Sequence, residues 1–180
     1  MTTTAVNTPG TKLYFMDVTV SPHVVVAVTA LKGFSPAGGG KRKKNDKSNF
    51  DSAAYNENQG GRIDPPEASG QIILLKSDSS HQLLKKLMEG QAAGTYSNDT
   101  QWFLGDSDAT SPPTIVTGAL TPPQTASPKH WARSGIKLVG YIATLQPKYE
   151  DDNIIMADFA IQCSGAPIWY SKGDLISKTY

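Results

Sequence analysis

The chain has 180 residues, of which 38% are apolar, enough for one domain with a hydrophobic core and too many for wholesale disorder. It carries 17 Lys and Arg against 16 Asp and Glu, so no overall field favours nucleic acid or an acidic membrane as a partner. The single cysteine, Cys163, excludes an internal disulfide and a cysteine-based zinc site. We expect no signal peptide, because MTTTAVNTPG lacks a charged start followed by an apolar run, and no membrane span, because no segment approaches about 18 apolar residues.

The residue pattern in the first part of the chain predicts two strands, followed by a long polar segment. Residues 13–20 and 23–31 are runs of β-branched and aromatic residues. The second run is apolar on both faces, which is typical of a strand in a sheet covered on both sides. Residues 33–69 then contain glycine, proline, charged and amide residues with little periodicity, so we expect a long loop before a strand resumes at 70–76.

One helix is predicted over SDSSHQLLKKLMEG, residues 77–90. Asp78 or Ser79 can cap its N-terminus, and Gly90 is expected to end it. Its apolar stripe consists of Leu83, Leu84, Leu87 and Met88. A helix of about a dozen residues is marginal alone in water, so this stripe must pack on the sheet.

The second half of the chain predicts four more strands, at 101–105, 114–120, 136–149 and 153–165. The last two are joined by the acidic residues 150–152, which predicts a hairpin. In the final strand one face is made by Ile155, Ala157, Phe159, Ile161 and Cys163, and the other carries Asp158 and Gln162.

No group of residues indicates an enzyme or a cofactor. SPAGGGKR has Ser35 and Arg42 where a phosphate-binding P-loop needs glycine and Ser/Thr. His23, His81 and His130 lack metal-ligand spacing, which favours solvated or core histidines over ligands. The carboxylates of the acidic loops are explained equally well as solvated turn residues. We therefore expect no catalytic residue, no cofactor and no metal.

The segment GGGKRKKNDKSNFDSAAYNENQGG, residues 38–61, is the unusual feature of the sequence. Residues 41–47 hold five cations and one acid, which leaves 12 basic and 15 acidic residues elsewhere, a formal charge of −3. Four adjacent cations, Lys41 to Lys44, can contact phosphates or can lie in a solvated loop tip. Phe50 and Tyr55 are spaced through the segment, which favours docking against another surface.

Several segments in serial order carry a family resemblance. They are the basic segment continued as GGRIDPPEASGQIIL, the helix DSSHQLLKKLMEG, the strand TQWFLG and the end IKLVGYIATLQPKYEDDNIIMADFAIQCSGAPIWY. Together they cover about residues 10–170 and resemble the major tail tube proteins of long non-contractile-tailed bacteriophages. The order and spacing of the segments carry this resemblance, because each motif alone is weak.

The resemblance implies a β-sandwich or partly closed barrel with one flanking helix, as a single domain over residues 1–180. It implies hexameric rings that stack into a tail tube, the conduit for double-stranded DNA ejection. The partners it implies are a tape measure protein, tail terminator and tail-tip proteins, and DNA that passes through the lumen without specific binding. The protein would be made in the host bacterial cytoplasm and reside in the virion tail, with no membrane partner.

The same resemblance implies that residues 33–69 form an inter-subunit loop, while the role of the arm 170–180 stays open. The ring-to-ring contact would be made by Lys41, Arg42, Lys43, Lys44, Phe50, Asp51 and Tyr55. Two alternatives stay open. The KRKK loop could mark a nucleic-acid-binding module, or the chain could be a related secretion-tube or tail-terminator ring protein.

Overall fold

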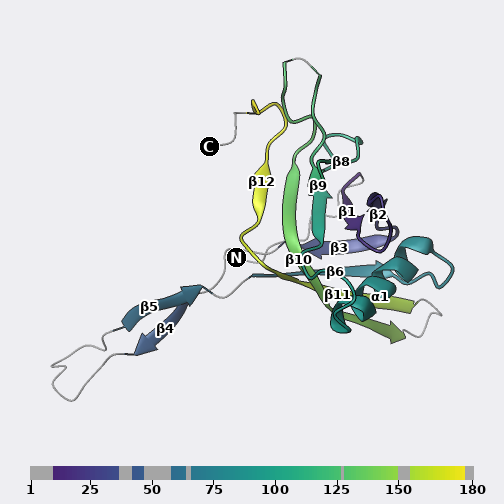
Figure 1. Cartoon of the computed structure of the whole chain (residues 1–180), viewed down its shortest axis with the longest axis vertical. Coiled ribbons are helices and arrows are strands. Elements are labelled where there is room, and N and C mark those ends of the chain that lie inside the picture. Colours follow the sequence, from purple (N-terminus) through teal and green to yellow (C-terminus); the bar gives the residue numbers. More distant parts are fainter. Residues whose placement is uncertain are drawn as a thin grey trace.

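The computed structural model of the chain describes residues 10–36, 42–46, 58–63, 66–126, 128–149 and 155–176 (Figure 1). These residues form the helix α1 (Ser79–Ala92) and twelve strands. The strands are β1 (Lys12–Asp17), β2 (Val24–Ala27), β3 (Leu31–Ser35), β4 (Arg42–Asp46), β5 (Asn58–Ile63), β6 (Glu67–Ile73), β7 (Gln101–Gly105), β8 (Thr114–Val116), β9 (Ala119–Thr121), β10 (Gly135–Tyr149), β11 (Ile155–Cys163) and β12 (Ile168–Tyr170).

Eight strands form one antiparallel sheet in the order β2-β1-β7-β10-β11-β6-β3, with β12 also paired to β10. The long strand β10 belongs to two layers, because Gly135–Val139 pair with β7 and Gly140–Tyr149 pair with β11. A register shift between Ile142 and Thr144 marks a β-bulge, which bends a strand and increases its twist. We call β2, β1, β7, β12 and the first half of β10 the first sheet, and β3, β6, β11 and the second half of β10 the second sheet.

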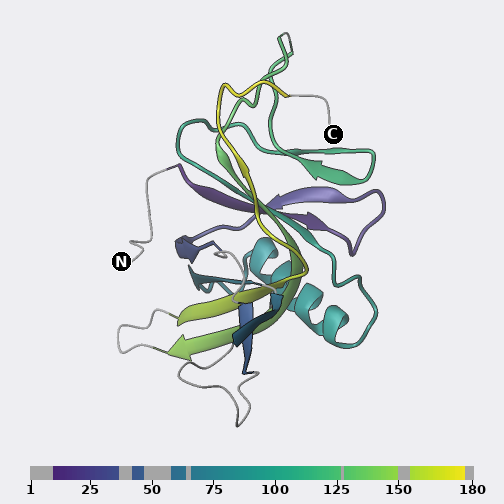
Figure 2. The same cartoon turned by 90° about the vertical axis from the view of Figure 1, so that its left-hand side faces the viewer.

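The predicted fold class is confirmed. The structure is mainly β with one helix, and its sheet does not close into a barrel within the described residues. Figure 2 shows the two sheets as separate layers, with α1 beside the second. The main core lies between these layers and includes Leu13, Phe15, Leu84, Leu87, Trp102, Phe159 and Ile161. Burial of this apolar surface is the principal force that holds the sheets and the helix together.

The helix begins as predicted and ends later. Asp78 is the N-cap, and its carboxylate accepts hydrogen bonds from the backbone N–H groups of Ser80 and His81. The helix continues past Gly90 to Ala92, and Gly94 follows with φ +72°. A Cβ at Gly90 would lie 2.1 Å from the ring of Tyr96. The expectation that Gly90 ends the helix was wrong, because this glycine makes room for an aromatic ring.

Two predicted strands are each divided in two. The run 23–31 becomes β2 and β3, separated at Ala30, whose φ of 51° is left-handed. β2 is the edge strand of the first sheet, and it is covered on both faces as expected, because Val26 packs on the main core and Val25 and Ala27 pack on a second cluster, while Val24 at its start is exposed. The run 114–120 becomes the hairpin β8–β9, which turns at Thr117 and Gly118, both with positive φ. Such a two-residue turn matches the twist of antiparallel strands.

The predicted loop 33–69 is shorter than expected and contains two strands. Its two ends belong to β3 and β6 of the second sheet. Between them β4 and β5 pair as an antiparallel hairpin, with Lys44 opposite Gly60 and Asp46 opposite Asn58. Their sequences, RKKND and NQGGRI, lack the β-branched and aromatic residues that signal strands, so periodicity could not reveal the pairing.

Candidate functional site

The second sheet has two open edges within the described part of the chain. β3 forms one edge, and the second half of β10 forms the other, since β7 pairs only with Gly135–Val139. Pro147 lies in the open half of β10. Proline has no N–H to donate, and within sheets it is confined to edges and bulges, so its presence fits an edge. An open edge presents unpaired backbone groups to any strand that can reach it.

These two edges are complementary in direction. The second sheet contains β10, β11, β6 and β3, each antiparallel to its neighbour. With an even number of antiparallel strands, the first and last strands run in opposite directions. A second copy placed edge to edge would therefore bring its β3 antiparallel to the β10 of the first copy, and the sheet could continue from copy to copy.

The faces of the second sheet differ in chemistry. One face packs on α1 and the core through Phe34, Phe159 and other apolar residues. The opposite face carries small and polar residues, and a shallow hollow of about 430 Å³ there is lined in part by Ser35, Ser69 and Thr144. This arrangement agrees with the predicted alternation in β11, whose Phe159 and Ile161 face the core.

One ion pair lies on this polar face. Asp158 forms a salt bridge with Lys148 and accepts a 2.9 Å hydrogen bond from Nε2 of Gln71. The hydrogen bond from the Lys148 ammonium and then that from Gln71 lower the pKa of Asp158 below its usual value. The carboxylate is 39% exposed, so solvent screens the pair and its contribution to folding is small.

Only part of the predicted assembly site lies in the described residues. Arg42, Lys43 and Lys44 belong to β4, and Arg42 stands opposite Ile63 of β5. Lys41, Phe50, Asp51 and Tyr55 lie outside the described residues. The hairpin thus gathers three of the predicted cations on one strand, and Figure 1 shows it standing away from the two sheets.

His81 is a core histidine, as the sequence favoured. It is 3% exposed, its Nδ1 accepts from the backbone N–H of Leu75 and its Nε2 donates to the carbonyl of Thr29. Both ring nitrogens are satisfied by backbone groups, which leaves neither for a metal. No cluster of possible metal ligands occurs in the part of the chain that the structure describes.

Sequence reasoning missed a buried arginine. Arg133 is fully buried, and its guanidinium donates to the carbonyls of Gly10, Gly105, Asp106 and Ser111 and to the hydroxyl of Tyr14. A Cβ at Gly105 would lie 2.5 Å from Nε of Arg133, so that glycine makes room for the guanidinium. Burial and the nearby Asp108 raise the pKa of Asp106. Arg133 ties the loops at one end of the first sheet together.

Sequence reasoning also missed the clamp between α1 and the bulge of β10. Gln91 is 5% exposed, and its Oε1 accepts from the N–H of Ile142 while its Nε2 donates to Oγ1 of Thr100 and the carbonyl of Ser97. The pairing of β10 with β7 ends at Val139, and beyond that point the amide of Gln91 satisfies the backbone N–H of Ile142. The helix thereby fixes the bend that divides β10 between the two sheets.

A two-layer antiparallel sheet with one helix and two complementary open edges defines a class of β-sandwich proteins suited to edge-to-edge assembly. Within that class, the chain belongs to the family described as "Phage tail tube, TTP, lambda-like", which matches residues 4–173. The resemblance noted in the sequence is therefore confirmed. The family is a structural one, and its members are components of the phage virion.

Two solved structures of a tail tube and a baseplate share the fold. The SPP1 tail tube, determined by solid-state NMR and cryo-EM, has a TM-score of 0.52 at 8% identity, over 92% of this chain and 78% of that one. The 6-fold symmetrised baseplate of the anti-feeding prophage has a TM-score of 0.53 at 8% identity, over 95% and 98% of the two chains. At such identities the similarity shows the fold alone. None of the curated protein sequences matches the chain.

Proposed function

We propose that this chain forms hexameric rings that stack into a phage tail tube, the conduit through which double-stranded DNA is ejected. The observation that carries the proposal is the pair of open, oppositely directed edges in the second sheet. Joined edge to edge, these sheets form a closed wall that leaves no exposed strand edge. The number six rests on the family resemblance and on the 6-fold symmetry recorded for the anti-feeding prophage baseplate.

The polar face of the second sheet lines the bore in this proposal. It lies opposite α1 and carries hydroxyl and amide groups, with the charge of Asp158 paired to Lys148. Glu67 shares this face with Ser69 and Gln71, because alternate residues of a strand point the same way. A surface of neutral polar groups and a few acids repels phosphates, so DNA slides without binding.

The predicted loop keeps its proposed role in a single domain over residues 1–180, while the role of the arm 170–180 stays open. The β4–β5 hairpin and the residues around it reach a subunit of the next ring, and Lys41, Arg42, Lys43 and Lys44 meet acids there. Part of the arm 170–180 packs on its own chain, because the N–H of Gly173 donates to the carbonyl of Trp131. The other partners are a tape measure protein inside the tube and terminator and tip proteins at its ends.

Negative-stain electron microscopy of the purified protein at rising concentration tests the proposal. We expect rings, and tubes once tape measure or tail-tip partners are added. Sedimentation that stays monomeric at high concentration, with no tubes after those additions, would refute it. Single rings that never stack would instead indicate a tail-terminator protein.

Changing Lys41, Arg42, Lys43 and Lys44 together to Ser tests the basic cluster. Thermal unfolding of the monomer should stay nearly unchanged, because exposed charges contribute little to folding. Stacking should fail, because the same charge pairs are lost from every subunit at each ring junction. A DNA-binding titration of the same variant at two salt concentrations distinguishes ring stacking from the alternative of a nucleic-acid-binding module. A nucleic-acid-binding module would lose a salt-sensitive affinity for DNA while still forming tubes.

A further inference from the structure

A groove lies between α1 and the end of β10, on the face of the second sheet that the helix covers. It has a volume of about 480 Å³, within the size range of sites that bind large side chains or small ligands. Its lining consists of Leu74, Leu75, Lys76, His81, Gln82, Lys85, Met88, Leu145, Pro147 and Tyr149. Nothing in the described part of the chain fills it.

The groove combines an apolar floor with a cationic rim. Leu75 is 46% exposed and Tyr149 is 78% exposed, and both of these large side chains line the same groove. Lys76 and Lys85 stand at the rim. Lys85 has a 3.7 Å contact with Glu89, but both side chains are largely exposed, so this pair holds the ammonium only weakly. Such a surface suits a segment that offers aromatic rings and carboxylates.

The β4–β5 hairpin forms a separate two-stranded sheet that projects from the rest of the described chain (Figure 1). β4 pairs with β5 and with no other described strand, and Figure 1 shows the hairpin projecting from the body. A two-stranded hairpin alone is at best marginally stable in water, so this one needs a partner surface to persist. The same chain thus carries an unpartnered projection and an unfilled groove.

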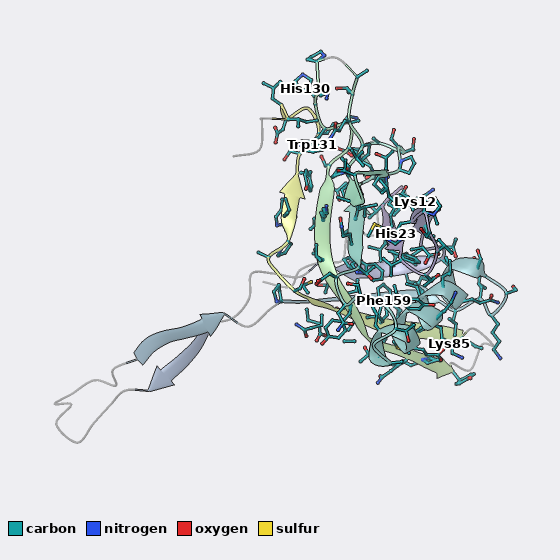
Figure 3. The ribbon with its side chains drawn as sticks, in the orientation of Figure 1. Lys12, His23, Lys85, His130, Trp131 and Phe159 are labelled. Atoms are coloured by element: carbon teal, nitrogen blue, oxygen red, sulfur yellow. The ribbon has the colours of Figure 1, made fainter. Side chains whose placement is uncertain are left out.

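The projection and the groove lie at opposite ends of the molecule. Figure 3 places Lys85, at the rim of the groove, on the side away from β4 and β5. Contacts between opposite ends of identical copies are heterologous and generate open stacks instead of closed dimers. The reach is sufficient, because the 15 Cα–Cα steps from Pro36 to Asp51 can span at most about 50 Å. By comparison, the nine residues of β11 extend about 30 Å.

The tip of the hairpin has the chemistry that the groove requires. The sequence between the two strands, residues 47–57, reads KSNFDSAAYNE and contains the rings of Phe50 and Tyr55. Its acids, Asp51 and Glu57, outnumber its one cation, Lys47, which gives a formal charge of −1 opposite the lysines of the groove. We propose that the groove between α1 and β10 binds the tip segment 47–57 of a second copy in the adjacent ring. The proposal rests on the stacking function and assigns the surface that receives the loop.

Disulfide trapping tests this contact in assembled tubes. A chain carrying both Tyr55→Cys and Tyr149→Cys is oxidised as tubes and as dilute subunits, and the products are separated without reductant. We expect a ladder of linked chains from tubes only. The matched control pairs Tyr55→Cys with Val116→Cys, since Val116 is also exposed, at 51%, but lies on β8. A ladder from the control and none from the test chain would overturn the proposal. The native Cys163 is buried and takes no part.

A charge exchange tests the same contact without cysteines. Lys85→Glu should reduce the fraction of protein in tubes about ten-fold, which corresponds to a coupling of roughly 1.4 kcal/mol. Adding Asp51→Lys should restore tubes. If Lys85→Glu lowers tube yield and no change in segment 47–57 rescues it, the groove binds another tail protein and the proposal fails. If every variant forms tubes equally, the proposal fails while the stacking function stands. If the unchanged chain forms no rings or tubes, the stacking function itself fails.

Discussion

The two sheets share β10 but have different surroundings. The first sheet is covered on both faces. One face packs on the main core, and on the other face Tyr14 and Phe103 of the sheet pack with Leu120 of the β8–β9 hairpin. The second sheet is covered on one face only, and both of its edges are open among the described residues. A sheet covered on both faces is specialised for stability. A sheet with one polar face and two free edges is incomplete alone, and in the proposed assembly neighbouring copies would complete it.

The largest effect on the first sheet should come from Arg133→Met. The change removes every hydrogen bond of a fully buried guanidinium and leaves four carbonyls without those donors. We expect the free energy of unfolding, measured with urea on the monomer, to fall by about 3–5 kcal/mol. Arg133→Lys, which keeps the charge but fewer donors, should lose less. A loss under about 1 kcal/mol for the Met variant would mean that the arginine does not hold the first sheet together.

A smaller effect is expected from Gly70→Ala in the second sheet. The added Cβ would lie 2.4 Å from the ring of Phe159 and 2.9 Å from that of Phe34. Two rings must shift, so we expect a loss of about 2 kcal/mol in urea unfolding. Gly165→Ala is the control, because a Cβ there meets no atom within 4 Å. Equal stability of the two variants would show that the second sheet is packed loosely enough to yield.

Asp78→Ala should cost about 1 kcal/mol near neutral pH, because it removes the N-cap of α1 and the 2.7 Å hydrogen bond from Thr29. Hydrogen bonds from the Ser80 and Thr29 side chains lower the pKa of Asp78 from 3.8 to about 2. A lowered carboxyl pKa contributes stability above the unfolded value, and that contribution is lost as pH falls through the folded value. The difference from the unchanged protein should therefore shrink between pH 3.8 and about 2.

The control for this pH series is Asp78→Asn. Asparagine caps helices about as well as aspartate, so it should lose little stability at neutral pH. It cannot titrate, so urea unfolding of this variant should show no acid-dependent loss at that site. A difference between Asp78→Ala and the unchanged protein that stays constant down to pH 2 would contradict the assignment of the low pKa.

Strong local patterns made much of the fold predictable. The strand at 101–105 was located to the residue, and the pair now seen as β10 and β11 was predicted, with the two faces of β11 correctly assigned. These segments alternate cleanly or are rich in β-branched and aromatic residues, so their own sequence specifies their structure. The N-cap of α1 was readable for the same reason, because capping is a local interaction.

The remainder depends on partners that are distant in sequence. Arg133 donates to Tyr14 and Gly10, which lie 119 and 123 residues away, and no local pattern marks such a contact. Gly90 looked like a helix end because its partner, Tyr96, belongs to the following loop. For the proposed assembly site, the charge run predicted the basic loop. The open edges and the groove are products of topology, so only the structure could reveal them.

The smallest effect is expected from Asp158→Asn on the polar face of the second sheet. Its salt bridge with Lys148 is partly exposed, so urea unfolding should change by no more than about 0.5 kcal/mol at neutral pH. The lowered pKa of Asp158 means that even this contribution should vanish as pH falls below the usual carboxyl range.

The small loss of stability expected for Asp158→Asn contrasts with the large loss expected for Arg133→Met, and this contrast distinguishes the second sheet from the first. If the polar face lines a bore, its residues serve the passage of DNA instead of folding. Substituting them should then leave the free energy of unfolding almost unchanged. The variant removes one acid per subunit from that face, so tubes should bind short DNA duplexes more strongly at low salt and lose the difference at high salt. A loss of more than about 1.5 kcal/mol in the monomer would place Asp158 among the residues that stabilise the fold, and the contrast between the sheets would fail at this position.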